Sequence, residues 1–176
     1  LAAADLPEIR ATDYLPLALR LAHWGSPAES LPWLEKPNLL ALRFAQQQLQ
    51  QMQLVDDEGA ITPAGKNVSN LGTHPRIAAF LLMHEGRVSR ASLMLALALH
   101  FELSAEHDFE DLLACAEREL ARNRQWQKLQ KRWLTSLNLQ IVNGEVNANS
   151  LARAFSDRIG FRQESGKYRL NSGISV

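Results

Sequence analysis

The sequence predicts a mostly α-helical protein, in which a small winged-helix unit precedes a helical bundle and a short β-hairpin follows near the C-terminus. Three observations lead to this prediction. Apolar residues recur with a helical period along most of the 176 residues. Residues 54–82 show, in order, a short strand, an acidic turn, a second strand and two helix starts, which is the order of a winged helix leading into a helical domain. Residues 160–170 have the pattern of two strands around a glycine-containing turn.

Two helices are expected before the first hairpin. Asp13 suits the N-cap of the first helix, and Gly25 ends it. Residues 26–36 contain two prolines and form a connector that the indole of Trp33 could anchor. Pro37-Asn38 opens the second helix, whose glutamines cover the solvent side. The apolar face of this second helix is formed by Leu39, Leu42, Ala45, Leu49 and Met52.

The predicted wing is a hairpin with an acidic turn. Leu54-Val55 and Ala60-Ile61 are its expected strands, and Gly59 allows the positive φ that closes the turn. Thr62 then caps a third helix, with Pro63 at the first helical position, where a missing N–H has no consequence. A further helix begins at Pro75.

The second half is expected to form a bundle. Residues 91–101 are apolar on nearly every side, which predicts the most buried helix of this half. Residues 108–121 form an amphipathic helix, and residues 122–139 continue or follow it. A turn at Asn143-Gly144 and a helix over 150–155 precede the C-terminal hairpin. The inward face of the amphipathic helix is expected to be Phe109, Leu112, Leu113, Ala116 and Leu120. Together the elements predict domains over residues 1–73, 74–150 and 151–176.

Composition excludes several classes of protein. Hydrophobic residues at 46% and charged residues at 22% are typical of an ordinary globular chain. No apolar run approaches the roughly 18 residues that a membrane span needs. The single Cys115 cannot form an intramolecular disulfide, so we expect a core thiol in a reducing compartment and a cytoplasmic location. Residues 1–4 contain neither an initiator Met nor a signal-peptide pattern, so we expect the chain to be part of a larger protein.

The formal net charge of zero hides an uneven distribution. Residues 102–119 contain one basic and seven acidic residues, whereas residues 120–176 contain ten basic and three acidic residues. This asymmetry favours an anionic partner for the basic part, although solvated helix faces produce the same pattern.

The sequence contains no recognisable catalytic or metal-binding motif. Gly65-Lys66 lacks the upstream glycine and the following Ser or Thr of a phosphate loop, so we interpret it as part of a helix start. Three adjacent acids at residues 56–58 lack the spaced ligands that calcium needs. The five histidines and Cys115 have no zinc-ligand spacing. We therefore expect no catalytic residue, no metal site and no cofactor in this chain.

The remaining candidate is the helix over residues 122–133. Trp126, Leu129 and Trp133 line one face, and basic residues on another face could follow a phosphate backbone. Two questions stay open: whether Glu117 and Glu119 merely neutralise these bases, and whether the tryptophans form core rather than a base-stacking platform. The candidate nucleic-acid-binding residues are Arg122, Arg124, Lys128, Lys131 and Arg132.

Taken in order, several motifs resemble the region behind the motor domains of DEAH-box helicases, with the bacterial HrpB-like branch as the nearest match. The sequence departs from that branch at Phe155-Ser156, where Tyr-Pro is common, and residues 138–150 are hard to align. The motifs are Pro7-Glu8-Ile9-Arg10, Trp24-Gly25, Trp33-Leu34, Asp57-Glu58-Gly59, Ile61-Thr62-Pro63-Ala64-Gly65, His74-Pro75-Arg76-Ile77-Ala78, Ala154-Phe155-Ser156-Asp157-Arg158-Ile159 and Tyr168-Arg169-Leu170-Asn171-Ser172-Gly173.

This resemblance implies a winged helix, a helical-bundle "ratchet" (helicase-associated) domain and the start of a further C-terminal domain. It also implies two partners: single-stranded nucleic acid, RNA or DNA, and the RecA-like motor domains of the same parent chain, where ATP and Mg would bind. The chain itself has no phosphate loop, DEAH box or arginine finger. The implied role is therefore non-catalytic: it braces the motor and forms a wall of the nucleic-acid channel.

Two other functions are considered. In a protein-interaction module, the acidic residues of the 102–119 stretch would form the working surface, and the basic helix would only balance their charge. A freestanding winged-helix transcription factor would need a basic recognition helix, and residues 63–71 offer only Lys66. The second possibility is therefore disfavoured.

Overall fold

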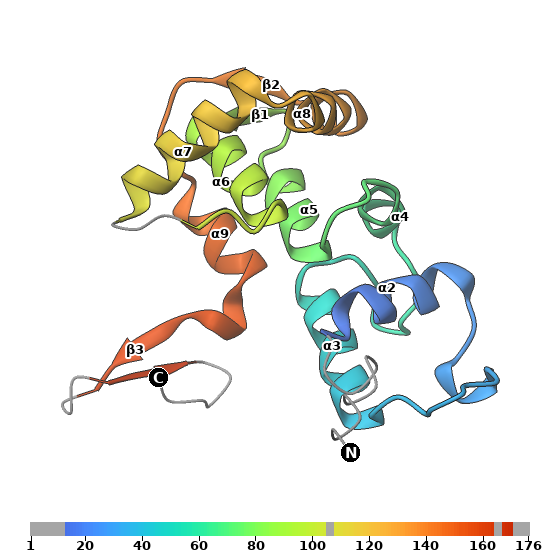
Figure 1. Ribbon diagram of the computed structural model, residues 1–176. Helices are drawn as coiled ribbons and strands as arrows, with labels where there is room; N and C mark the ends of the chain where they lie inside the picture. The colour runs from blue at the N-terminus through green and yellow to red at the C-terminus, as the bar shows by residue number, and fades with distance from the viewer. Residues whose placement is uncertain (1–12, 105–107, 164–166, 171–176) are drawn as a thin grey trace, which may run out of the picture. The chain divides into compact units, whose positions relative to one another are not determined.

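The computed structural model describes residues 13–104, 108–163 and 167–170, and these are mostly helical, which confirms the predicted fold class. The chain divides into two compact units, Leu1–Pro75 and Arg76–Val176 (Figure 1). The three-domain division at residues 74 and 151 stays a prediction. No helix among the described residues combines the length and the apolar character needed to cross a membrane.

The helices of the first unit begin and end close to where local sequence signals place them. The N-cap of the first helix is Tyr14, one residue after the expected Asp13, whose Oδ1 atom accepts the N–H of Leu15 at 2.8 Å; Gly25 ends this helix with a φ of 68°. Asn38 caps the long helix through the N–H groups of Leu40 and Ala41. The elements are α2 (Leu15–Trp24), η1 (Ala28–Ser30), α3 (Leu39–Gln51) and α4 (Pro63–Asn70).

The core of this unit forms where α2 packs against α3 and α4. Leu15 and Leu49 are fully buried there, and Leu42 and Val68 nearly so. The connector between α2 and α3 is tied down by the indole of Trp33, whose Nε1 donates to the Ala28 carbonyl at 2.6 Å, as the sequence predicted. Leu39, in contrast, is 43% exposed, because it occupies the first turn of α3, beyond the reach of the core.

The expected wing is reduced to a single bridge between Val55 and Ile61 instead of two strands. Two backbone hydrogen bonds flank this bridge, from Asp56 N–H to the Ala60 carbonyl at 2.9 Å and from Thr62 N–H to the Leu54 carbonyl at 3.1 Å. In addition, the Oδ1 atom of Asp56 accepts the N–H groups of Glu58 and Ala60 at 3.1 and 2.7 Å. The turn is therefore closed by backbone hydrogen bonds together with the Asp56 carboxylate. Gly59 has the expected positive φ, 83°.

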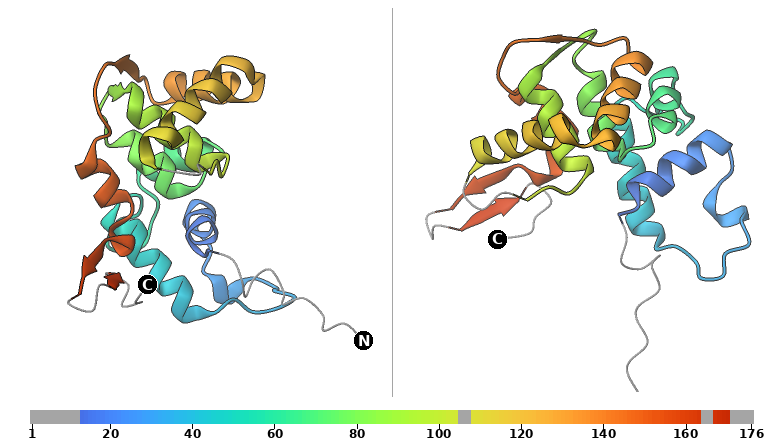
Figure 2. Two further views of the ribbon diagram at one scale, coloured as in Figure 1. Left: turned by 60° about the vertical axis from the view of Figure 1, so that its left-hand side comes forward. Right: turned by 45° about the horizontal axis from the view of Figure 1, so that its top comes forward.

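The second unit surrounds one buried helix, α6 (Arg90–His100), as the all-round apolar sequence predicted. α7 (Phe109–Arg122) and α8 (Arg124–Ser136) contact α6 and each other (Figure 2). Phe109 is 47% exposed and does not face inward as expected, because it is the first residue of α7. The other elements are α5 (Pro75–Leu82), β1 (Arg87–Ser89), β2 (Gln140–Val142), α9 (Ala148–Ala154), η2 (Ser156–Arg158), β3 (Gly160–Arg162) and β4 (Tyr168–Leu170).

A parallel strand pair, which the sequence analysis did not predict, joins two segments of the second unit that lie far apart in the sequence. β1 pairs with β2 in the register Arg87–Gln140, Val88–Ile141 and Ser89–Val142. The Ser89 hydroxyl donates to the Glu145 carbonyl at 2.7 Å, and the Asn147 N–H donates to the Ser92 hydroxyl at 3.1 Å. Asn147 then caps α9, which therefore begins at Ala148 and not at Ser150.

Arg76 ties the start of α5 to the C-terminal segment. Its guanidinium binds both carboxylate oxygens of Asp157, at 2.5 and 3.0 Å, and also donates to the Ala154 carbonyl at 3.2 Å. It lies 5.8 Å from the centre of the Phe155 ring. Two motifs quoted for the resemblance, at residues 74–78 and 154–159, thus meet in the structure. The C-terminal hairpin is present as β3 paired antiparallel with β4, which confirms the prediction for these strands.

Candidate nucleic-acid interface

The predicted basic segment is divided between two helices. α7 ends at Arg122, and Asn123 adopts an extended conformation before its side chain accepts the N–H of Gln125 as the cap of α8. The amide of Gln127 donates back to the carbonyls of Leu120 and Ala121, at 2.9 and 3.2 Å. Side chains therefore satisfy the backbone groups that the break would otherwise leave unpaired. The residues after Asn123 therefore form a separate helix, α8, and do not continue α7.

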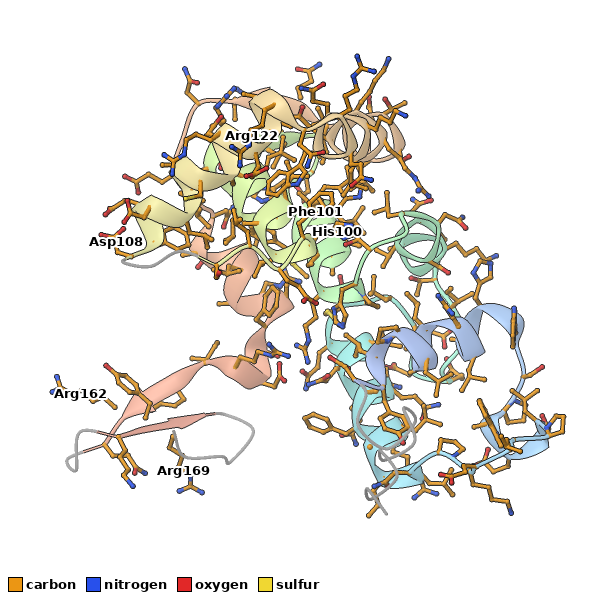
Figure 3. The ribbon with its side chains drawn as sticks, in the orientation of Figure 1. His100, Phe101, Asp108, Arg122, Arg162 and Arg169 are labelled. Carbon is orange, nitrogen blue, oxygen red and sulfur yellow. The ribbon has the colours of Figure 1, made fainter. Side chains whose placement is uncertain are left out.

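The two tryptophans of α8 belong to the core. Trp126 is 3% exposed and stacks on Phe101 at a centroid distance of 4.6 Å. Trp133 is fully buried and meets the ring of His100 edge-on at 5.6 Å. His100 and Phe101 end the buried helix α6 (Figure 3). Because these indoles are covered by the protein's own rings, they are not a base-stacking platform.

The basic residues of α8 lie on the solvent side. Arg124, Lys128 and Lys131 follow the i, i+4, i+7 spacing of one helix face, opposite the tryptophans, and all three are exposed. Among the described residues, no hydrogen bond or ion pair engages these three side chains. Arg132 is also exposed and takes part in an interaction within the chain.

The nearby acids neutralise only part of this set. Arg122 is paired with Glu119 within the last turn of α7, and the hydrogen bond to that carboxylate raises the pKa of the guanidinium. Glu117 is paired with Arg90 of α6 at 2.5 Å and with none of the five candidates. The side chains most available to an anion are therefore Arg124, Lys128 and Lys131.

The acidic residues of the 102–119 stretch have a structural role at the start of α7. Asp108 caps this helix by accepting the N–H of Asp111 at 2.9 Å, and Glu110 and Asp111 occupy the first turn. Negative charge is favourable at a helix N-terminus, as positive charge is at the C-terminus, where Arg122 lies. Figure 3 shows Asp108 and Arg122 at opposite ends of the helix. Residue 106, also acidic, lies outside the described residues.

Other residues considered from the sequence form no site. Gly65 lies inside α4, where a Cβ would come within 2.0 Å of the Leu54 carbonyl oxygen, so this glycine is needed for packing. Cys115 is half-buried, not a core thiol, and its sulfur accepts a hydrogen bond from Arg118 at 2.9 Å. The described part of the chain contains no group of three or more His, Cys, Asp or Glu that could hold a metal ion.

The sequence analysis missed a second group of exposed cations, on the C-terminal hairpin. Arg162, Lys167 and Arg169 are exposed, as are the aromatic rings of Phe161 and Tyr168. The alternation of aromatic and basic residues along both strands was the signal available in the sequence.

Comparisons with known proteins agree with the resemblance drawn from the motifs. No family model matches the sequence, and no curated protein matches it either. Among solved structures, the chain is similar to a crystal structure of the E. coli DExH-box NTPase HrpB, with a TM-score of 0.72, 26% sequence identity and 99% of this chain covered. It is also similar to a crystal structure described as the Escherichia coli DEAH/RHA helicase HrpB, with a TM-score of 0.73, 27% identity and 99% coverage. The chain spans 21–22% of the length of those chains.

Proposed function

We propose that the chain is a non-catalytic accessory region of an ATP-dependent DEAH-box helicase that contacts single-stranded nucleic acid and braces the motor domains. The similarity of nearly the whole chain to part of HrpB supports the helicase assignment. In this proposal the first unit is the winged helix, and α5 to α8 belong to the ratchet domain. ATP and Mg would bind to the RecA-like motor domains of the parent protein, which would be cytoplasmic.

The observation that carries the nucleic-acid contact is the exposed basic face of α8. Arg124, Lys128 and Lys131 project from a helix whose other face is anchored by two buried tryptophans. A rigid helix with cations at successive turns can follow a phosphate backbone, and such binding is independent of the base sequence. Arg122 and Arg132 flank this face, and Arg122 would need to leave Glu119 to join the contact.

The salt dependence of binding tests this contact. We expect the chain to bind a fluorescent single-stranded oligonucleotide weakly, with an affinity that falls as salt rises. The triple variant R124Q/K128Q/K131Q should reduce the magnitude of the slope of log K against log salt by about 2, because each lost phosphate contact on a single strand contributes about 0.7. An unchanged slope would exclude α8 as the interface.

A matched control removes the same charge elsewhere. Arg20, Arg43 and Lys66 are exposed residues of the first unit. The variant R20Q/R43Q/K66Q should keep the wild-type slope, since only total charge changes. If both triple variants lower the slope equally, the effect is one of net charge and the assignment of α8 is wrong.

The alternative function is a protein-interaction module that uses the acidic start of α7. One observation weakens it: Asp108, Glu110 and Asp111 already stabilise the N-terminus of that helix. If the rival were correct, D111N/E110Q would abolish the docking of a partner protein while oligonucleotide binding stayed at the wild-type level.

A further inference from the structure

The segment that joins β2 to α9 contains the one Asn-Gly pair of the sequence, Asn143-Gly144. Asparagine is a chemically labile residue, and a following glycine favours the loss of its side-chain amide because no Cβ shields the glycine nitrogen. The structure explains why a glycine follows: Gly144 has a φ of 152°, a conformation that residues with a Cβ rarely adopt. The backbone of this segment therefore requires the residue that makes Asn143 labile.

The groups that would react are unrestrained in the part of the chain that the structure describes. Within residues 13–104, 108–163 and 167–170, no hydrogen bond engages the side chain of Asn143 or the N–H of Gly144, and water reaches both residues. The two asparagines that follow differ. The Oδ1 atom of Asn147 accepts the N–H of Ser150 at 3.0 Å, and this bond also occupies the nitrogen that would attack Asn149.

The same segment binds the start of α6 through two hydrogen bonds. The Glu145 carbonyl accepts the hydroxyl of Ser89 at 2.7 Å, and the Asn147 N–H donates to the hydroxyl of Ser92 at 3.1 Å. Both serines are buried, and their hydroxyls are hydrogen-bonded to each other at 2.8 Å. The segment 143–147 must therefore keep one length, with β2 at one end and these serines at the other.

We propose that Asn143 is a site of spontaneous modification, and that its isoaspartate product releases residues 145–147 from Ser89 and Ser92. The Gly144 nitrogen loses its proton to hydroxide and bonds to Cγ of Asn143, while the Cγ–Nδ2 bond breaks and ammonia leaves with a proton from water. Water then opens the cyclic imide at one of its two carbonyls, which gives aspartate or isoaspartate. This inference is independent of the proposed contact with nucleic acid.

The release follows from the length of the isoaspartate backbone. In that product the main chain passes through Cβ and Cγ of residue 143, which adds one C–C bond of about 1.5 Å. An O–H···O hydrogen bond has a preferred length of about 2.7 Å and tolerates a change of only a few tenths of an ångström. The bond between Ser89 and Glu145 would therefore break unless β2 moved, and a buried hydroxyl would lose a partner.

Peptide mapping tests the modification. The chain is incubated at mildly alkaline pH, digested and analysed by mass spectrometry with electron-transfer fragmentation, which distinguishes isoaspartate from aspartate. We expect a mass gain of about 1 Da at Asn143 that forms faster at higher pH, because the attacking nitrogen must lose its proton. Asn149 is the internal control and should stay unmodified, as should residue 143 in Asn143→Gln, whose larger ring closes much more slowly. No gain at Asn143, or an equal gain at Asn149, would overturn the proposal.

Comparison of the separated forms tests the release. The isoaspartate form is isolated by ion exchange, and its equilibrium constant for unfolding in urea should be about tenfold larger than that of the unmodified chain, which is the effect of about one buried hydrogen bond. Hydrogen exchange should be faster at the amide of Asn147. Freshly prepared Asn143→Asp adds the same charge without the longer backbone and should match the unmodified chain in both measurements. Equal stability of the isoaspartate form and the unmodified chain would overturn the release, and so would an equal loss in Asn143→Asp.

Discussion

At the scale of single residues, Gly65 shows how a motif that resembles a phosphate loop can serve packing. A Cβ at this position would lie 2.0 Å from the Leu54 carbonyl oxygen and 2.8 Å from Cγ1 of Ile61. The Leu54 oxygen belongs to the backbone and also accepts the N–H of Thr62 at 3.1 Å. Moving it away from a new Cβ would therefore break this hydrogen bond. The glycine allows α4 to approach the reduced hairpin closely.

We therefore predict that Gly65→Ala lowers the free energy of unfolding by about 3 kcal/mol, the upper range for overpacking. Urea denaturation followed by circular dichroism measures this loss. Asn67→Ala, an exposed substitution in the same helix, should change the stability by no more than about 0.5 kcal/mol. Equal stability of the two variants would show that α4 can move away from the hairpin at no cost.

His84 predicts a dependence of stability on pH. Burial lowers its pKa below the ordinary value, and its Nε2 atom is buried with no hydrogen-bond partner among the described residues. Its ring meets Phe80 edge-on at 5.1 Å. A histidine with a lowered pKa in the folded state binds fewer protons there than in the unfolded chain, so stability falls as the pH drops below about 6.5.

We expect His84→Leu to remove part of this acid sensitivity. Thermal melts at pH 7.5 give the packing cost of the substitution, since the imidazole is neutral there in both states. As the pH is lowered to 5, the variant should lose less stability than the wild type. Parallel pH profiles of the two proteins would show that His84 does not contribute. His100, whose pKa burial also lowers, should account for part of the remaining slope.

At the scale of elements, a largely buried ion pair joins the start of α5 to η2, the short helix that follows α9. The Arg76 side chain is 5% exposed and that of Asp157 is 17% exposed. Removal of one partner from such a pair leaves an uncompensated charge in the interior. The Arg90–Glu117 pair is more exposed, with side chains at 55% and 34%, so water screens it.

Asp157→Asn should accordingly destabilise the protein by about 3–5 kcal/mol. Glu117→Gln should cost less than about 1 kcal/mol. Chemical denaturation compares the two variants, and hydrogen exchange should show the amides of α9 opening first in Asp157→Asn. Similar losses in both variants would contradict the difference in burial.

The success of the sequence predictions depended on how local their signals were. Helix boundaries at Gly25, Asn38 and Thr62 were predictable because a cap is decided by neighbouring residues. The β1–β2 pair was not, since three-residue strands lack a period and their partners lie about fifty residues apart. The pairing of Arg76 with Asp157 was missed for the same reason. For the candidate site, the basic face of α8 was predictable from spacing, whereas the pairing of Arg122 with Glu119 needed the structure.

At the scale of the whole molecule, a neutral total charge does not cancel the basic surface. α7 has 14 residues, so its acidic start and basic end are about 20 Å apart. At physiological ionic strength the screening length is about 8 Å, less than half this separation. An anion near α8 therefore experiences the local cations much more strongly than the carboxylates of Asp108 and Glu110. The basic residues that are clustered in the sequence thus form a basic surface on α8 in the folded chain.

The proposed role also predicts how this surface acts within a complete helicase. If the chain belongs to a longer protein with RecA-like motor domains, single-stranded nucleic acid that reaches the motor would also lie along α8. Loss of three phosphate contacts should then raise the concentration of single-stranded RNA or DNA needed for half-maximal stimulation of ATP hydrolysis by about tenfold at moderate salt. A coupled ATPase assay on the parent carrying R124Q/K128Q/K131Q measures this shift, with R20Q/R43Q/K66Q as the charge-matched control. The shift should grow larger at low salt, because each lost phosphate contact contributes more to binding there. A shift independent of salt would indicate that the substitutions act on the motor instead.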